Sequence, residues 1–250
     1  MFISPLIPMS ADSRVNHEPA FLLSTIPWRE SSLLAEMFTR HYGRVVLIAR
    51  SARKRQSELR GVLTPFVPLS VSWYGTQELK TLHRAQWIGG WPSPQARALF
   101  SALYVNELIL KLTAREDPAP LIYDAVHQVM SALCLGGESA ALRYFEWDLL
   151  HHLGFAPDIT QDENGTAIDA DAHYYMRPEY APALLTQINV PTTEKGISIC
   201  GETLLSLSKK TLHLNTRARQ ETLRLTRLLL DFRLPEGIHS RRVLQQLRQF

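Results

Sequence analysis

The stretch of sequence that decides the fold reads His41-Tyr-Gly-Arg-Val-Val-Leu-Ile-Ala-Arg-Ser-Ala-Arg-Lys-Arg-Gln56. An apolar run of strand type leads directly into a cationic segment. Between residues 40 and 60 the single acidic side chain is Glu58, against the basic residues Arg40, Arg44, Arg50, Arg53, Lys54, Arg55 and Arg60. A strand that feeds a cationic loop suits a protein that follows a polyphosphate backbone. The alternative, a solvated basic surface without a partner, fits dispersed charge better than this dense run.

The charge is unevenly distributed along the chain. The formal net charge is +5 for residues 1–90, −9 for residues 91–208 and +7 for residues 209–250. The overall value of +3 therefore hides two basic ends around an acidic middle. Such asymmetry indicates that the ends contact nucleic acid and that the middle has another role.

The N-terminal half contains short segments of strand type. They lie at residues 21–26, 33–40, 43–49, 59–66 and 69–73, and residues 79–86 can add one more. This spacing suits a small barrel or sandwich. Among these, the five-stranded OB-fold barrel is the smallest that routinely binds nucleic acid. We predict an OB-fold nucleic-acid-binding domain over residues 19–88, preceded by a flexible N-terminal tail at residues 1–18.

The pattern changes to helix after Trp91-Pro-Ser-Pro94. We predict an all-helical domain over residues 89–250, which makes the fold class α+β. Its helices are expected at residues 94–113, 121–135, 139–153, 182–188, 202–214, 216–232 and 241–250. Residues 155–178 lose the helical period and form a hairpin-like insertion, with Asn164-Gly165 as its turn.

Motifs for catalysis and metal binding are absent from the sequence. It contains no phosphate-binding loop, dinucleotide fingerprint, nucleophile elbow or His-Glu-x-x-His motif. Adjacent helical positions point about 100° apart, so His151 and His152 do not easily share one metal. We predict no catalytic residue, no cofactor and no metal. The two cysteines, Cys134 and Cys200, are expected to be free buried thiols, and with no secretory signal we expect a cytoplasmic protein.

Several segments, in collinear order, resemble the RecO family of DNA repair proteins. Pro27-Trp-Arg-Glu-Ser-Ser-Leu33, the stretch from His41, Leu59-Arg-Gly-Val-Leu-Thr-Pro-Phe66 and Leu79-Lys-Thr-Leu-His-Arg-Ala85 are similar to its N-terminal domain. Leu103-Tyr-Val-Asn-Glu-Leu108, Leu142-Arg-Tyr-Phe-Glu-Trp-Asp-Leu-Leu-His-His-Leu-Gly154 and Ser240-Arg-Arg-Val-Leu244 are similar to its helical domain.

The resemblance implies a mediator of DNA repair and recombination that has no catalytic site. It implies an OB-fold and a helical domain, binding of single- and double-stranded DNA, and annealing of complementary strands at the nucleoid. It also implies recognition of the acidic C-terminal tail of single-strand-binding protein, and RecA loading with RecR. Many members carry a four-cysteine zinc site between helices, whereas only Cys200 lies in that region here. We therefore expect the 155–178 insertion to keep its shape without a metal.

The candidate DNA-binding side chains form two groups. The first lies on two predicted strands and their joining loop, and can converge on one groove wall; it comprises Arg44, Arg50, Arg53, Lys54, Arg55 and Arg60. Tyr42, Phe66, Trp73 and Tyr74 offer stacking faces, although Tyr42 and Trp73 are alternatively core residues. The second group comprises Arg217, Arg224, Arg227, Arg241 and Arg242, beside Lys209 and Lys210. Its alternative is a solvated helix face opposite Leu225, Leu229 and Phe232.

The tail of single-strand-binding protein needs an apolar pocket with a fixed positive charge. Arg143 is the only basic residue besides histidines between residues 116 and 176. It is our candidate for the carboxylate contact, with Leu121, Tyr123 and Leu142 as pocket walls. The alternative is an intrahelical pair with Glu146 or stacking on Trp147.

Two other functions are compatible with the composition. One is an RNA-binding OB-fold adaptor without a recombination role. The other is an unrecognised phosphodiester enzyme, although no paired carboxylate site lies in the basic region to favour it.

Overall fold

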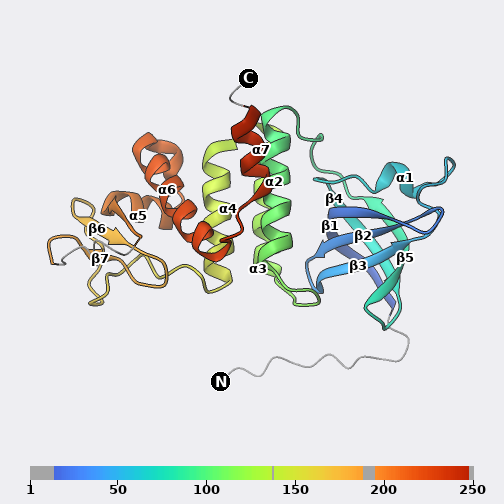
Figure 1. The fold of residues 1–250 in the computed structure, drawn as a ribbon, viewed down its shortest axis with the longest axis horizontal. Helices are drawn as coiled ribbons and strands as arrows, with labels where there is room; N and C mark the ends of the chain where they lie inside the picture. Colours follow the sequence, from blue (N-terminus) through green and yellow to red (C-terminus); the bar gives the residue numbers. More distant parts are fainter. Residues whose placement is uncertain (1–13, 137, 188–194, 248–250) are drawn as a thin grey trace. The chain divides into compact units, whose positions relative to one another are not determined.

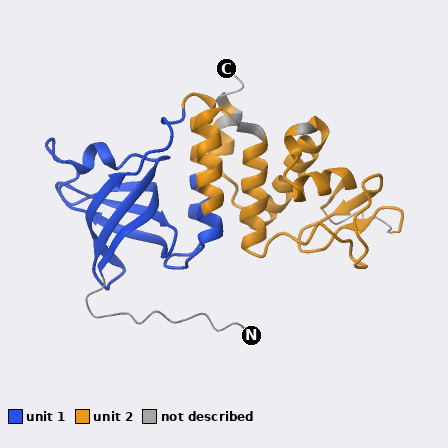
Figure 2. Cartoon of the chain, turned by 180° about the vertical axis from the view of Figure 1, so that it is seen from behind, with its two compact units in different colours: residues 1–94, 106–123 blue, residues 95–105, 124–250 orange. Residues whose placement is uncertain are grey.

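The computed structural model describes residues 14–136, 138–187 and 195–247 (Figure 1). The chain forms two compact units, coloured separately in Figure 2. Unit 1 comprises residues 1–94 and 106–123, and unit 2 comprises residues 95–105 and 124–250. Unit 1 therefore takes in a segment well beyond the domain end predicted at residue 88.

Unit 1 is built on a closed five-stranded barrel. Its strands are β1 (Arg14–Trp28), β2 (Ser32–Thr39), β3 (Gly43–Ala49), β4 (Pro68–Tyr74) and β5 (Leu79–Trp87). Around the barrel their order is β1-β2-β3-β5-β4, with β1 pairing with β4 to close it. The β3–β5 pair is parallel and the other pairs are antiparallel. This is the OB-type arrangement predicted from the sequence.

Two local predictions for this unit were wrong. The segment 59–66 is not a strand, because helix α1 (Leu59–Val62) occupies its start. Leu59, Val62 and Leu63 pack against the barrel core, and this i, i+3, i+4 spacing is helical. Strand β1 begins at Arg14, so residues 14–18 belong to the barrel rather than to a tail. Residues 1–13 lie outside the described part of the chain.

The barrel interior is filled by apolar side chains that alternate along the strands. Met37, Leu47, Leu69, Val71 and Trp73 are all at most 1% exposed. Trp73 is therefore a core residue, in agreement with the alternative interpretation of its role. Burial of such large side chains supplies the main stabilisation of a small barrel.

A second apolar cluster joins the outside of the barrel to the segment 106–123. Phe21 of β1 lies 5.4 Å from Tyr123 and 6.4 Å from Trp91, measured between ring centroids. The Asn106 amide donates hydrogen bonds to the carbonyls of Leu22 and Leu23, at 3.3 and 3.2 Å. A bulge interrupts the pairing of β1 with β2 at this point, so the amide meets backbone groups that the ladder leaves open.

Unit 2 is mainly helical. Helices α2 (Arg97–Leu112) and α3 (Pro120–Leu135) run through both units, and α4 (Glu138–His152), α5 (Gly201–Ser208), the short helix η1 (Leu212–Leu214), α6 (Thr216–Arg233) and α7 (His239–Leu247) belong to unit 2. These elements confirm most of the predicted helices. A helix over residues 182–187 was wrong, because this part forms a strand and a turn.

A three-stranded sheet of order β7-β6-β8 lies among these helices. Its strands are β6 (His173–Met176), β7 (Ala183–Leu184) and β8 (Ile197–Cys200). The turn predicted at Asn164-Gly165 is present before the sheet. There the Asp162 carboxylate accepts hydrogen bonds from the backbone N–H groups of Asn164 and Thr166, both at 2.9 Å.

A buried carboxylate, Glu146 of α4, links the helices of unit 2. It is 1% exposed and accepts hydrogen bonds from the Tyr104 hydroxyl and the Arg143 guanidinium, both at 2.7 Å, and from the Thr226 hydroxyl at 2.5 Å. Arg241 donates in turn to the Tyr104 oxygen at 2.9 Å. Burial and the neighbouring Glu146 charge raise the pKa of Tyr104, so the phenol stays protonated and donates.

A second buried carboxylate, Glu221 of α6, fixes the end of the small sheet. It accepts hydrogen bonds from the Thr203 hydroxyl at 2.6 Å, the Cys200 N–H at 3.1 Å and the Arg217 guanidinium at 2.9 Å. Burial alone raises the pKa of Glu221, but these hydrogen bonds outweigh it and the net pKa is lowered.

Removal of the central carboxylate should destabilise unit 2 strongly. We expect Glu146→Ala to lower the free energy of unfolding by about 3–5 kcal/mol, because it leaves a buried guanidinium and two hydroxyls without their acceptor. Urea denaturation monitored by circular dichroism measures this. Glu163→Ala, at an exposed glutamate of the same unit, is the control, and equal midpoints for the two variants would contradict the role of Glu146.

Glu221 should make stability depend on pH. Because its folded-state pKa lies below the ordinary value of 4.5, its contribution is present above pH 4.5 and is lost as the pH falls through the lowered pKa. We expect Glu221→Gln to be less stable than the original protein at neutral pH, with the difference shrinking in acid. Urea titrations over a pH series measure it; a constant difference would refute the assignment.

Candidate nucleic-acid interface

The loop between β3 and α1 carries the densest exposed positive charge of unit 1. Arg50, Arg53, Lys54 and Arg55 are exposed on this loop, and Arg60 is exposed on α1. Within the described residues, none of these five side chains forms an ion pair. Their charge faces solvent, and the exposed Glu58 is the acidic residue of the same segment. We call these five residues the basic loop.

The backbone of the basic loop is fixed to the barrel. Ala52 is 1% exposed and belongs to the barrel core, so it anchors the loop in its middle. The Arg53 N–H donates to the Ser31 carbonyl of the β1–β2 turn at 2.9 Å, and turn bonds run from Lys54 N–H to Ser51 and from Ser57 N–H to Lys54. The cations are therefore presented from an ordered backbone rather than from a free chain.

One cation of this surface, Arg29, was not among the residues predicted from the sequence. It is exposed on the β1–β2 turn, and its carbonyl accepts a hydrogen bond from the Arg53 guanidinium at 3.4 Å. Its guanidinium carbon lies 6.0 Å from the centre of the Trp28 ring. Antiparallel pairing of β1, β2 and β3 brings this turn to the end of β3 where the basic loop starts, so a strand-pairing argument would have found it.

Arg44 has a different environment from the basic loop. Its side chain is only 13% exposed and forms an ion pair with Glu36 at 2.8 Å. It also donates to the Thr113 carbonyl at 2.7 Å. Burial lowers the pKa of Arg44, and Glu36 opposes that effect. Arg44 thus holds the segment after α2 against β2 and β3.

The same segment covers the outside of β2 and β3 further. Arg115 pairs with Glu36 at 3.1 Å, and the Glu116 N–H donates to the Arg44 carbonyl at 2.9 Å. A Cβ atom at Gly43 would lie 2.1 Å from the Asp117 carbonyl oxygen, so only glycine allows this approach. In OB-folds, ligands commonly bind on the face formed by strands 2 and 3. Here residues 113–117 of the same chain lie on that face.

The four candidate stacking rings differ in their exposure to solvent. Phe66 and Trp73 are buried, whereas Tyr42 and Tyr74 are 42% and 43% exposed. The Tyr42 ring packs edge-on against Trp73, with 5.3 Å between the ring centroids. Tyr74 lies on the outer side of β4 and leaves its ring open to solvent.

The cations predicted near the C-terminus lie in unit 2 and differ in exposure. Arg217, Arg224 and Arg227 are exposed along α6, and Leu225 and Leu229 are buried on its other side.

The remaining two members of this group lie on α7. The Arg241 side chain is 20% exposed and pairs with Asp231 at 2.7 Å. Arg242 is exposed and donates to the Glu236 carbonyl at 3.3 Å. Arg241 thus has a structural role, whereas Arg242 faces solvent.

The predicted tail-binding residues are not gathered into one compact unit. Leu121 and Tyr123 belong to unit 1, with Leu121 60% exposed and Tyr123 buried. Arg143 and Leu142 belong to unit 2. Arg143 is buried and makes the intrahelical pair with Glu146 that the alternative interpretation expected.

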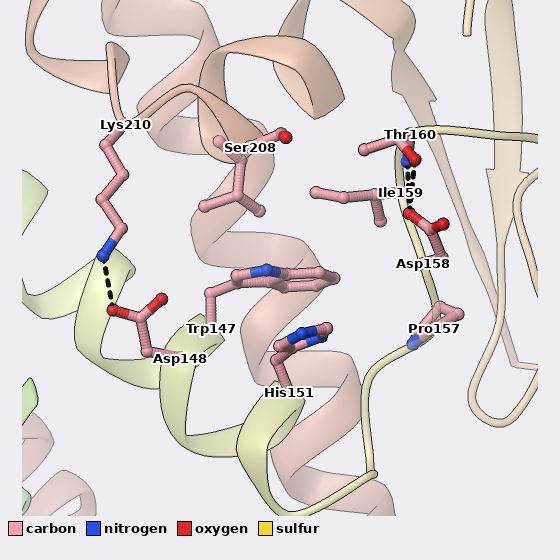
Figure 3. Close-up of a pocket in the computed structure, with 10 residues that line it drawn as sticks. Trp147, Asp148, His151, Pro157, Asp158, Ile159, Thr160, Ser208 and Lys210 are labelled. Atoms are coloured by element: carbon pink, nitrogen blue, oxygen red, sulfur yellow. Dashed lines mark hydrogen bonds and ion pairs between the residues drawn. The ribbon is translucent and has the colours of Figure 1, made fainter. Parts of the chain in front are cut away.

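A pocket of about 490 Å³ opens on unit 2 one helical turn beyond Arg143 (Figure 3). Its apolar lining is Trp147, Pro157, Ile159 and Leu207, and its polar lining is Asp148, His151, Asp158, Thr160, Ser208 and Lys210. The Lys210 ammonium pairs with Asp148 at 2.8 Å at one edge. The pocket thus combines an aromatic wall with one exposed cation.

Among the described residues, the cysteine and histidine side chains do not come together in a metal-binding site. Cys200 is buried and Cys134 half-buried, and both are free; burial raises the pKa of Cys134 to about 11. Among the residues that the structure describes, no three His, Cys, Asp or Glu side chains are placed to hold a metal ion. Within the same residues, no helix is both long and apolar enough to cross a membrane.

Two family models together match most of the chain. The model described as "Recombination protein O N terminal" matches residues 14–91, and the model described as "Recombination protein O C terminal" matches residues 94–242. The first match covers all five barrel strands and the basic loop. The second covers the helices α2 to α6 and the small sheet.

Curated relatives agree with the two models. The DNA repair protein RecO of Neisseria meningitidis serogroup B is 55% identical over 96% of this chain and 92% of its own length. The protein of the same name from Neisseria gonorrhoeae is 56% identical over 96% of this chain and 98% of its own length. That of Chromobacterium violaceum is 42% identical over 80% of this chain and 82% of its own. The chain therefore belongs to the RecO family of DNA repair proteins.

Proposed function

We propose that this protein binds single- and double-stranded DNA and anneals complementary strands, acting as a mediator of repair and recombination without a catalytic step. The observation that carries the proposal is the basic loop: five exposed cations on an ordered backbone that form no ion pair with any described residue, joined by Arg29. Such contacts neutralise phosphates and carry no sequence information, so binding extends to any sequence. Annealing requires that the repulsion between two strands be neutralised while their bases stay accessible.

Family membership supports a proposal about the partners. We propose that the protein recognises the acidic C-terminal tail of single-strand-binding protein and, with RecR, loads RecA onto the coated DNA at the nucleoid. Arg217, Arg224, Arg227 and Arg242 of unit 2 are exposed and are proposed to extend the DNA contact. An RNA-binding adaptor is not favoured, because the matching models and relatives are named for recombination and DNA repair.

The Trp147 pocket supports the tail proposal. A tail that ends in an apolar side chain and a free carboxylate requires an apolar wall and a positive charge at its rim. Arg143, our sequence candidate, is buried and donates to Glu146, whereas Lys210 pairs with Asp148 through a side chain that stays 50% exposed at the pocket edge. We therefore propose that Lys210 meets the carboxylate and that Arg143 shapes the pocket by fixing α4.

The triple variant Arg53→Ala, Lys54→Ala, Arg55→Ala tests the basic loop. If about six cations contact a single strand, log Kd against log salt has a slope of magnitude about 4, and three lost contacts reduce it by about 2. Fluorescence anisotropy over a salt series measures the slope, and a quenched-strand assay measures the annealing rate, which should fall. The matched control, Arg53→Lys with Arg55→Lys, keeps the charge and should behave like the original protein. Unchanged slope and annealing in the triple variant would refute the proposal.

Lys210→Ala tests the tail site. We expect weaker binding of a labelled acidic peptide with a free C-terminal carboxylate, because the charge at the pocket edge is lost. Titration calorimetry measures the affinity, and Lys209→Ala, at the neighbouring exposed lysine, is the control. Equal affinity of both variants and the original protein would contradict the placement, and no binding by the original protein would contradict tail recognition itself.

A further inference from the structure

The outer face of the β4–β5 hairpin is a second open surface of the barrel. Neither strand contains an aspartate or glutamate. Tyr74 of β4 and His83 and Arg84 of β5 are exposed on it. In the ladder, Tyr74 is directly opposite Arg14 of β1, whose side chain is also exposed. The face therefore combines the rings of Tyr74 and His83 with the guanidinium groups of Arg14 and Arg84. Neither β4 nor β5 contributes an acidic side chain that would repel an anion.

A bulge in β5 sets the arrangement of these side chains. Ser72 pairs with Arg84 and the next residue, Trp73, pairs with Leu82. His83 is therefore the extra residue of the bulge and has no residue opposite it on β4. The imidazole of His83 lies near the phenol of Tyr74, with 6.4 Å between the ring centroids and planes 63° apart. Bulges commonly re-aim side chains beside functional sites, and here the bulge keeps Leu82 in the core while it leaves His83 exposed.

On this face Tyr74, His83 and Arg84 are exposed, whereas residues 113–117 lie on the face of β2 and β3. An OB barrel that binds a single strand needs aromatic rings for the bases and cations for the phosphates. The basic loop has the cations, and among the described residues the half-buried Trp28 is the ring recorded beside Arg29. The β4–β5 face has exposed rings as well as cations. The two surfaces thus differ in the chemistry that each can offer to DNA.

We propose that the β4–β5 face binds single-stranded DNA, with bases stacking on Tyr74 and His83 and with Arg14 and Arg84 contacting phosphates. The inference rests on the proposed function and adds a second DNA-binding surface to the basic loop. Unpaired bases expose their faces to such rings, whereas the bases of a duplex are already stacked on one another, so this face selects single strands. The basic loop, which reads only phosphates, accepts both forms. One barrel then contacts two strands during annealing.

Tyr74→Ala is the direct test. Base stacking on an aromatic side chain contributes about 1–3 kcal/mol, so the affinity for a labelled oligothymidylate should fall roughly 5- to 100-fold. The affinity for a duplex should be unchanged. Tyr74→Phe keeps the ring and should bind like the original protein, and Tyr180→Ala, at a tyrosine of unit 2 that is 51% exposed, is the matched control. Fluorescence anisotropy at one salt concentration measures all four proteins.

The outcomes separate this inference from the proposed function. If the original protein binds DNA and Tyr74→Ala binds oligothymidylate equally well, the inference is overturned while the proposed function stands. An equal loss for single strands and duplex also overturns it, because stacking must discriminate between them. If the original protein binds neither form, the proposed function fails first. Arg84→Glu, a charge reversal on an exposed side chain, gives a second readout if Tyr74→Ala does not fold, and it should lower the oligothymidylate affinity.

Discussion

The structure of unit 1 depends on one strand, β1, that pairs along both of its edges. Its first half pairs with β4 and its second half with β2, and this double pairing closes the barrel. The pairing of β1 is interrupted between Val15 and Glu18 on the β4 side, and on the β2 side by a bulge between Leu22 and Ser24. Asn106 binds the carbonyls at that bulge. The segment 106–123 is therefore attached to the same strand that closes the barrel.

The carboxylates of the acidic middle and of α6 explain why net charge is an incomplete guide to a binding surface. Glu146 and Glu221 are buried, and each accepts from an arginine within one turn of its own helix. Glu36 holds two arginines at the barrel wall. Removing a carboxylate from water is costly unless it is paired or hydrogen-bonded, and each of these three acids has an arginine nearby. Arg44, Arg115 and Arg143 thus maintain the fold, and Arg217 does so while its side chain stays 60% exposed.

Strands and long helices could be predicted because their patterns are local: apolar alternation for β2 and β3, and the 3.6-residue period for α2, α3, α4 and α6. The small sheet could not, since its strands of two to four residues are recognised only through pairing across the chain. The basic loop was predictable from charge density. The structural roles of Arg44 and Arg241 were not, because their hydrogen-bond partners lie 69 and 137 residues away.

The hydrogen bond from the Arg53 N–H to the Ser31 carbonyl joins two loops that carry charge. Cations on a loop that is already ordered lose less conformational entropy when a ligand arrives. Their combined field also acts before contact, since fixed charges of one sign accelerate the encounter with an anion at low salt. Because this hydrogen bond orders the loop in the free protein, it affects the rate of the proposed association with DNA as well as the affinity of the final complex.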